Sequence, residues 1–226
     1  MASTDSARDV VAFALEQARA AGAYQAEVAL SSGEAFETRV RGREIDFVKQ
    51  SRDKSLGVRV YVGGRGGLST AAARTSDLAR EVVARTAADA VALARATVPD
   101  ACAGLPDGGF ASEVPDLELF EPRDRPFEPA TRIEAARACE TAAHATDPRI
   151  GDSEGSQSGS GYSELTYGNS AGFLGEDASA RHSLVAESLA RGAGTRSSPP
   201  RRWGAAPRSA RCAGWARAAC RPAKCR

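Results

Sequence analysis

A glycine-rich turn between two predicted strands constrains the fold of this chain more than any other stretch. It lies within KSLGVRVYVGGRGGLSTAAA, residues 54–73. Val58, Val60 and Val62 alternate with Arg59 and Tyr61, which predicts a half-buried strand. Four glycines follow this strand: Gly63, Gly64, Gly66 and Gly67. Because glycine adopts positive φ at little cost, these four predict a tight reversal into a return strand.

Gly57 interrupts the first strand of this hairpin. Glycine ordinarily weakens a strand interior, so we expect a β-bulge or a close approach of neighbouring backbone at Gly57. We therefore interpret Gly57, Arg59 and the four glycines of the turn as a structural hairpin. The alternative is a recognition surface, in which Arg59 holds a bound peptide.

The segments around the hairpin predict an α+β fold. Three alternating segments precede it, at residues 26–30, 36–40 and 45–48, with a bend at Gly42. Together with the hairpin they predict four or five consecutive strands in an antiparallel meander sheet. Short apolar alternations between residues 149 and 190, separated by Gly, Ser and Asn, predict a second set of short strands.

Three segments carry apolar residues at helical spacing. They predict helices over residues 5–21, 76–98 and 130–146 that pack on the sheet. Thr75, Ser76 and Asp77 supply side chains of the kind that cap a helix N-terminus, so the second helix is expected to begin there. The stripe of that helix extends to Val98.

The C-terminal residues 191–226 differ from the rest of the chain. They hold ten Lys or Arg, no Asp or Glu, and no Leu, Ile, Val, Phe, Met or Tyr. Such a segment can bury little, so we expect a disordered tail. Its Arg/Ala/Pro-rich composition is typical of a GC-rich gene read out of frame, which predicts a frameshift product; a genuine basic tail is the alternative. The predicted domain is therefore residues 1–190.

The predicted domain has a thin core and an acidic balance. Leu, Ile, Val and Phe make up 37 of the 226 residues, about 16%. A chain this poor in large aliphatic residues is expected to pack against another domain or subunit. Residues 1–190 hold 20 Lys or Arg against 29 Asp or Glu, so this surface is an improbable partner for nucleic acid.

The sequence predicts a cytoplasmic protein without a membrane segment. The N-terminus has no apolar stretch typical of a secretory signal, and no window approaches the roughly 18 apolar residues of a membrane span. Only Cys102 and Cys139 of the five cysteines precede the tail, which excludes a disulfide framework.

No residue pattern predicts a catalytic or metal site in this chain. A zinc peptidase helix needs two histidines one turn apart with a glutamate beside the first. Neither His144 nor His182 has such neighbours. Gly155-Ser156-Gln157-Ser158-Gly159 has glutamine where a nucleophile elbow needs serine, so a strand connection is expected there.

Four stretches resemble the TldD/PmbA family, the metallopeptidase-related proteins also called modulators of DNA gyrase. They are Ser55-Leu56-Gly57-Val58-Arg59-Val60-Tyr61 with its glycine turn, Pro99-Asp100-Ala101-Cys102-Ala103-Gly104-Leu105, Pro115-Asp116-Leu117-Glu118-Leu119-Phe120, and Tyr167-Gly168-Asn169-Ser170-Ala171-Gly172. The last three resemble the PmbA-like branch. The resemblance covers residues 8–190 and does not extend into the tail.

The resemblance implies an N-terminal domain of a PmbA-like subunit whose C-terminal domain is missing. In the family, the TldD-like member carries a zinc-binding His-Glu…His motif for peptide hydrolysis. Its PmbA-like partner lacks that motif and joins it around a chamber for unfolded peptides. No position here matches the motif, so zinc is expected only in the TldD-like partner. The implied partners are a TldD-like subunit or the missing C-terminal domain, and an unfolded peptide.

Two other functions remain open from the sequence. The chain could be a free-standing peptide-binding module, in which a sheet edge captures an extended peptide by β-augmentation. The basic tail could also make a weak nucleic-acid contact, which only its charge suggests.

Overall fold

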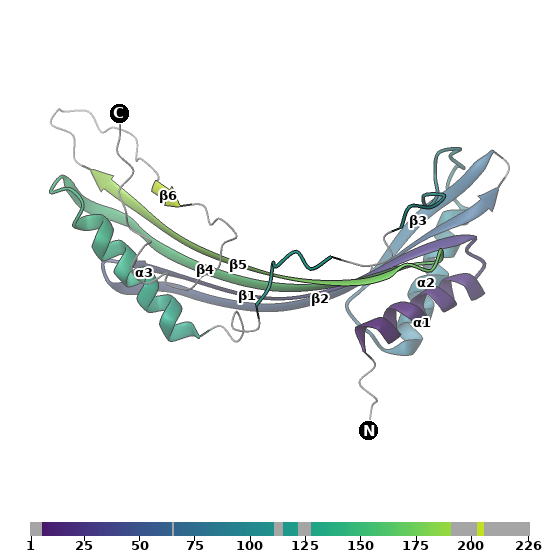
Figure 1. Cartoon of the computed structure of the whole chain (residues 1–226), viewed down its shortest axis with the longest axis horizontal. Helices are drawn as coiled ribbons and strands as arrows, with labels where there is room; N and C mark the ends of the chain where they lie inside the picture. Colours follow the sequence, from purple (N-terminus) through teal and green to yellow (C-terminus); the bar gives the residue numbers. More distant parts are fainter. Residues whose placement is uncertain (1–5, 65, 111–114, 122–127, 191–202, 206–226) are drawn as a thin grey trace, which may run out of the picture. The chain divides into compact units, whose positions relative to one another are not determined.

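The computed structural model describes residues 6–64, 66–110, 115–121, 128–190 and 203–205. In this part of the chain the elements are α1 (Ala7–Ala20), β1 (Gln25–Arg41), β2 (Glu44–Gly64), β3 (Gly67–Thr75), α2 (Arg80–Arg95), α3 (Pro129–His144), β4 (Ile150–Asn169), β5 (Leu174–Ala190) and β6 (Trp203–Ala205) (Figure 1). The strands form one sheet in the order β3-β2-β1-β4-β5-β6. Strands that follow one another in the sequence are neighbours in the sheet, with one exception. β4 lies beside β1 and not beside β3.

The chain forms two compact units. Unit 1 comprises Met1–Gly33, Asp53–Leu117 and Ser163–Ala178. Unit 2 comprises Glu34–Arg52, Glu118–Tyr162 and Ser179–Arg226. Helices α1 and α2 therefore belong to unit 1 and α3 to unit 2, whereas β1, β2, β4 and β5 contribute residues to both.

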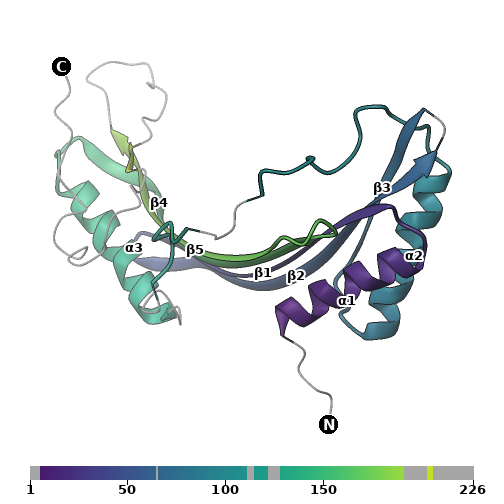
Figure 2. The ribbon, with the colours of Figure 1, turned by 45° about the vertical axis from the view of Figure 1, so that its right-hand side comes forward.

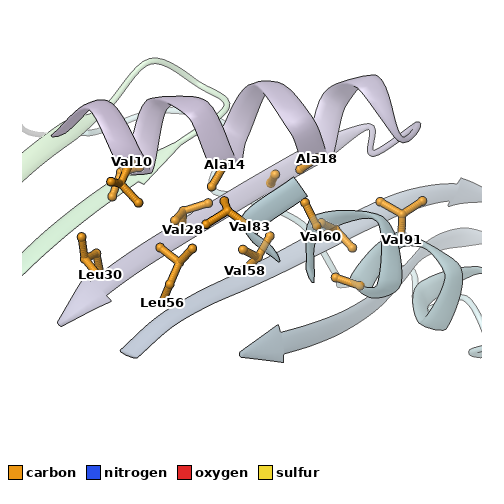
Figure 3. Packing of buried hydrophobic residues seen from close by; sticks show 14 of the residues in the cluster. Val10, Ala14, Ala18, Val28, Leu30, Leu56, Val58, Val60, Val83 and Val91 are labelled. Carbon is orange, nitrogen blue, oxygen red and sulfur yellow. The ribbon is translucent and has the colours of Figure 1, made fainter. Parts of the chain in front are cut away.

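Unit 1 has a hydrophobic core between two helices and the sheet. Helices α1 and α2 lie side by side (Figure 2), and valine, leucine and alanine side chains fill the space between them and the strands (Figure 3). The core residues are Val10, Val11, Ala14, Ala18, Ala26, Val28, Leu30, Leu56, Val58, Val60, Val83, Ala87, Ala90, Val91 and Ala94. In this unit the even-numbered residues of β1 (Ala26, Val28 and Leu30) and of β2 (Leu56, Val58 and Val60) face the helices, because successive side chains of a strand point to opposite faces.

A capping box fixes the start of α1. The Ser6 hydroxyl accepts the Asp9 backbone N–H at 3.2 Å, and the Asp9 carboxylate accepts the Ser6 N–H at 3.1 Å. Two N–H groups that the helix cannot pair itself are thereby satisfied. Hydrogen bonds from the Ser6 side chain and backbone lower the pKa of Asp9 below its usual value.

Most of the buried residues described in unit 2 are polar. They are Thr38, Glu140, Ser153, Ser156, Ser158, Ser160 and Ser188, beside the hydrophobic Phe36, Val40, Ala136 and Tyr162. Two of the hydroxyls bond the backbone of a neighbouring strand: Thr38 donates to the Phe47 carbonyl and Ser156 to the Val185 carbonyl, each at 3.0 Å. Hydrogen bonds therefore hold the strands of this unit where unit 1 uses apolar packing.

Glu140 of α3 binds the turn between β1 and β2. Its carboxylate is buried, at 2% exposed, and accepts the backbone N–H groups of Gly42 at 2.9 Å and Arg43 at 3.0 Å. Gly42 and Arg43 have φ of 59° and 69°, as a two-residue type I′ turn requires. The bend expected at Gly42 is this turn, and α3 lies beside it (Figure 1).

The predicted α+β class and antiparallel sheet are confirmed, but the strands are longer and fewer than expected. The segments at residues 26–30 and 36–40 join in β1, and β2 continues from Glu44 through the polar residues 49–55. The expected second set of short strands is the long pair β4 and β5. Polar residues stay extended here because they pair with neighbouring strands, which the apolar pattern alone does not report.

Helix α2 is shorter than predicted at both ends. It begins at Arg80, because Thr75 and Asp77 side chains hold a turn before it: the Thr75 hydroxyl accepts the Asp77 N–H, and the Asp77 carboxylate accepts the Ala79 N–H. It ends at Arg95, and Val98, expected on its buried stripe, is 87% exposed. Helix α3 lies within two residues of its predicted bounds at each end.

Candidate functional site

The hairpin at the centre of the sequence is formed by β2 and β3. In its register Gly57 lies opposite Arg74, Arg59 opposite Ala72, Gly63 opposite Leu68 and Gly64 opposite Gly67. The positive φ angles lie at Gly66 (93°) and Gly67 (138°). Gly63 has no neighbouring atom within 4 Å of where a Cβ would lie.

Gly67 is required by a close approach of backbone. A Cβ on Gly67 would lie 2.3 Å from the Asp100 carbonyl oxygen, well inside van der Waals contact. Asp100 lies close to Gly67 because it forms a β-bridge with Leu68, the residue after Gly67. The Leu68 N–H donates to the Asp100 carbonyl at 3.1 Å, and the Asp100 N–H donates to the Leu68 carbonyl at 3.0 Å. The segment that follows α2 is thus attached to the outer edge of β3.

The expectation for Gly57 is wrong. Its register with β3 is continuous, without a bulge, and the nearest atom to a Cβ at Gly57 is the Arg74 Cγ at 3.8 Å. An alanine side chain fits in that space. The close approach predicted for this hairpin occurs ten residues later, at Gly67.

Arg59 belongs to a polar cluster on unit 1, the Glu27 cluster, formed by Glu27, Arg59, Tyr61 and Tyr167. The Glu27 Oε1 accepts hydrogen bonds from Arg59 Nη1 at 2.7 Å and from the Tyr61 hydroxyl at 3.2 Å. The Glu27 Oε2 accepts one from the Tyr167 hydroxyl at 2.7 Å. Three strands, β1, β2 and β4, therefore meet at one carboxylate.

The cluster lies on the sheet face away from α1 and α2. Glu27, Arg59 and Tyr61 are odd-numbered, whereas the even-numbered Val28, Val58 and Val60 are in the core below the helices. Gly168, the neighbour of Tyr167, faces α1: a Cβ there would lie 2.8 Å from Val11 Cγ1.

The segment after Asp100 also lies on this face. The Leu105 N–H donates to Gln25 Oε1 at 2.9 Å, and Gln25 shares its face with Glu27. Phe173 lies beside both Tyr167 and Phe110, with ring centroids 5.9 Å and 6.2 Å away. Aromatic side chains therefore border the Glu27 cluster on one side.

Burial and the Glu27 charge keep both phenols protonated. Burial raises the pKa of Tyr61 above its usual value of 10, and the negative charge of Glu27 adds to this. Burial and the hydrogen bond to Glu27 raise the pKa of Tyr167 in the same direction. The hydrogen bond to Glu27 also raises the pKa of Arg59, so the guanidinium is charged at neutral pH.

This arrangement suits binding better than bond breaking. The carboxylate already accepts three donors and the phenols hold their protons, so none of these groups is free to act as a base. The Arg59 side chain is 58% exposed and has further N–H donors that can bind a carbonyl or carboxylate. Sequence reasoning found Arg59 but missed Glu27, whose signal was an acidic residue inside an apolar strand.

The two histidines belong to unit 2, whereas the Glu27 cluster belongs to unit 1. His144 is in the last turn of α3, and the His182 Nδ1 lies 3.0 Å from the Ser160 hydroxyl in unit 2. Among the residues that the structure describes, no group of three or more His, Cys, Asp or Glu is arranged to hold a metal ion. Within the same residues, no helix is long and apolar enough to cross a bilayer.

Most of residues 191–226 lies outside the described part of the chain. Residues Trp203–Ala205 form β6, in which Trp203 lies opposite Ala186, Gly204 opposite Val185 and Ala205 opposite Leu184 of β5. The disorder expected for the other tail residues, and their frameshift origin, remain predictions.

Two family models match the chain. PmbA/TldA metallopeptidase domain 1 matches residues 26–94, and the PmbA/TldA metallopeptidase central domain matches residues 122–225. The second match passes the boundary expected at residue 190 and reaches into the tail, where no resemblance was expected.

Curated relatives match over part of their length. The chain is 39% identical over 160 residues to the metalloprotease PmbA of Escherichia coli O157:H7, which covers 70% of this chain and 34% of that protein. It is 38% identical over 178 residues to a metalloprotease PmbA homolog of Haemophilus influenzae, covering 78% and 38%. The chain thus spans little more than a third of the length of these relatives.

Solved structures share the fold. A protein described as a modulator of DNA gyrase from Bacteroides thetaiotaomicron has a TM-score of 0.74 at 26% identity, over 86% of this chain and 43% of that one. TldE from Thermococcus kodakarensis has a TM-score of 0.69 at 17% identity, over 84% and 41%. With the two family models and the PmbA relatives, these likenesses show that the chain is a PmbA-like member of the PmbA/TldD metallopeptidase family.

Proposed function

We propose that this chain is a non-catalytic part of a PmbA/TldD-type peptidase assembly, and that it binds unfolded peptide substrates. The zinc and the hydrolytic centre are supplied by a TldD-like subunit, and the site of action is the cytoplasm. The observation that carries the proposal is the family match: the models of domain 1 and of the central domain of PmbA/TldA metallopeptidases match residues 26–94 and 122–225.

The geometry of the described residues supports a binding role. The Glu27 carboxylate is held by three donors, and its partner Arg59 has a side chain that is 58% exposed and carries further N–H groups. Extended peptides offer backbone carbonyls and a terminal carboxylate, which a guanidinium recognises well. His144 and His182 lie on α3 and β5 without the one-turn spacing of a zinc pair.

The test is an activity assay on the full chain with and without a TldD-like subunit from the same organism. The substrate is a fluorescein-labelled, reduced and carboxymethylated casein. We expect no hydrolysis by the chain alone, a complex on mixing, and faster hydrolysis by the complex than by the TldD-like subunit alone. One tightly bound zinc per chain, together with chelator-sensitive hydrolysis by the chain alone, would overturn the proposal.

Peptide binding without any assembly is a second candidate, which the exposure of Arg59 favours. Fluorescence anisotropy of the labelled casein measures it directly on the full chain. Arg59→Ala should weaken binding, whereas Arg85→Ala, an equal loss of charge on the exposed side of α2, should not. Equal binding by both variants would exclude Arg59 as the contact. The weak nucleic-acid contact that the charge of the tail suggests would lie largely outside the described residues.

A further inference from the structure

Unit 1 contains a groove beside the first turn of α1. Its volume is about 560 Å³, within the range of pockets that bind small molecules, and all of its lining residues belong to unit 1. Its apolar wall includes Val10 of α1, Leu30 of β1 and Leu78, which precedes α2. Val10 and Leu30 lie at the same end of the core cluster (Figure 3). We call this cavity the Lys54 groove.

Three polar side chains form a row across the floor of the Lys54 groove. The Ser31 hydroxyl lies 3.4 Å from the Ser55 carbonyl, which places the next residue of β1, Ser32, opposite Lys54 of β2. The bond between β1 and β2 in the Glu27 cluster has the same register. On the other side of β1, the Ser32 hydroxyl donates to Glu164 Oε2 of β4 at 3.2 Å. A cation and a carboxylate therefore lie on either side of one serine.

This row lies on the face of the sheet that also carries the core. Leu30 and Leu56 face the helices, so Ser32 and Lys54, each two residues away along its strand, point to the same side. Lys54 is exposed, and among the described residues it has no hydrogen-bond or ion-pair partner. Glu164 is exposed too, and a carboxylate has about four acceptor sites, so it can accept an ammonium besides the Ser32 hydroxyl.

The other acidic side chains of the groove are paired or point away. Glu176 accepts hydrogen bonds from Arg8 Nε at 2.6 Å and from the Thr166 hydroxyl at 3.3 Å. Asp177 is the next residue of β5, so its side chain points to the opposite face of the sheet. Lys54 and Glu164 are therefore the charged groups that a ligand in the groove would meet.

Two opposite charges select a ligand that carries both signs. A carboxylate alone would be attracted by Lys54 and repelled by Glu164, and an ammonium alone would meet the reverse. A peptide with free termini carries both groups, because its α-amino and α-carboxyl groups are charged at pH 7. Such a ligand is attracted at both of its ends.

The spacing of the two charges sets the length of the peptide. Neighbouring strands lie about 4.8 Å apart, so the backbones of Lys54 and Glu164, on either side of β1, are separated by about 10 Å. Three residues of extended chain also span about 10 Å. With its amino end at Glu164 and its carboxyl end at Lys54, a tripeptide can turn its middle side chain toward the apolar wall.

We propose that the Lys54 groove binds short peptides of about three residues that have both termini free and an aliphatic side chain at the centre. Lys54 binds the terminal carboxylate and Glu164 the terminal ammonium. The aliphatic side chain packs against Val10, Leu30 and Leu78. The site does not rest on the proposed function, because it shares no residue with the Glu27 cluster.

Isothermal titration calorimetry of the full chain with the tripeptide Ala-Leu-Ala tests the site. We expect saturable binding with a Kd below about 1 mM. Acetylation of the amino end, or amidation of the carboxyl end, removes one charged contact and should weaken binding about tenfold. Gly-Gly-Gly keeps both charges but has no side chain to bury, so it should also bind more weakly.

Two variants identify the residue that holds each end. Lys54→Gln should weaken binding of Ala-Leu-Ala about tenfold without further weakening the amidated peptide, since that contact is already absent. Glu164→Gln should show the same relation to the acetylated peptide. Lys49→Gln and Glu81→Gln, at exposed side chains outside the groove, are the matched controls and should bind as the parent does.

Four results would each overturn the proposal. They are no saturable binding up to about 5 mM peptide, an affinity that either terminal modification leaves unchanged, equal binding of Gly-Gly-Gly, and a loss in Lys54→Gln or Glu164→Gln that simply adds to the loss caused by the modification it should replace.

Discussion

Val58 of unit 1 and Ser156 of unit 2 are both completely buried on strands of one sheet, yet different interactions hold them. Val58 packs among the side chains of α1 and α2, and Ser156 donates a hydrogen bond to the Val185 carbonyl. Apolar burial stabilises in proportion to area and tolerates small displacements. A buried hydroxyl stabilises only while its bond is well aligned. Unit 2 should therefore be the less stable unit, and the more dependent on neighbours.

The largest effect is expected from the core of unit 1. Leu56→Ala removes a fully buried side chain and should destabilise this unit by about 2–5 kcal/mol. Hydrogen exchange followed by mass spectrometry should show faster exchange in peptides of unit 1 than in the parent, with little change in α3. Leu93→Ala, at a side chain 53% exposed on α2, is the control and should change little. Equal loss of protection in both units would mean that they share one core.

Gly67→Val should have the next largest effect. Its φ of 138° is strained for valine by about 1–3 kcal/mol, and the new side chain would clash with the Asp100 carbonyl. Because the Leu68–Asp100 bridge must open, protection should fall at Leu68 and Asp100. Gly57→Ala is the matched substitution on the same hairpin and should leave the urea midpoint unchanged or raise it. If Gly57→Ala lowered the urea midpoint more than Gly67→Val does, the close approach of backbone expected at Gly57 would be supported after all.

Glu140→Ala tests the polar core of unit 2. It leaves the N–H groups of Gly42 and Arg43 without their acceptor, a loss of about 1–3 kcal/mol. Exchange should quicken at the β1–β2 turn and in α3, while the core of unit 1 stays protected. Glu134→Ala, on the same helix with a side chain 73% exposed, serves as the control. Unchanged exchange at the β1–β2 turn would show that apolar contacts hold this turn without the Glu140 carboxylate.

The smallest effect concerns the polar residues of unit 1. Because Tyr61 and Tyr167 have raised pKa values, the folded state holds these protons more tightly than the unfolded state does. Their contribution to stability is complete below the usual value of 10 and falls as pH rises through the raised values. Urea midpoints on either side of pH 10 should fall less steeply for the double variant Tyr61→Phe/Tyr167→Phe. Tyr24→Phe, at a ring 71% exposed, should keep the parent's slope.

The same contrast explains how much the sequence could predict. Helix α1 and the β2–β3 hairpin were predicted within a few residues, because apolar spacing reports directly on burial. β4 was expected as short strands, because its buried residues include Ser153, Ser156, Ser158 and Ser160. Serine in a strand does not signal burial, since its hydrogen-bond partner lies on another strand.

The candidate site was predicted in part for a similar reason. Arg59 was found from a local pattern, but its partner Glu27 lies on a strand 32 residues before it, and Tyr167, which also bonds Glu27, lies on a strand more than a hundred residues after it. No local spacing predicts that these strands converge. The close approach was expected at Gly57 and occurs at Gly67, because it depends on the position of Asp100, which no local pattern reports.

The strand order also determines which parts of the sheet can form first during synthesis on the ribosome. The core residues of unit 1 all lie between Val10 and Ala94, so this core is complete when the first hundred residues have emerged. β4, which lies beside β1, begins only at Ile150. Synthesis adds about 5–20 residues per second, so the edge of β1 stays unpaired for several seconds before β4 has been made. The exposed, charged start of β2 would help to keep that nascent sheet soluble until β4 arrives.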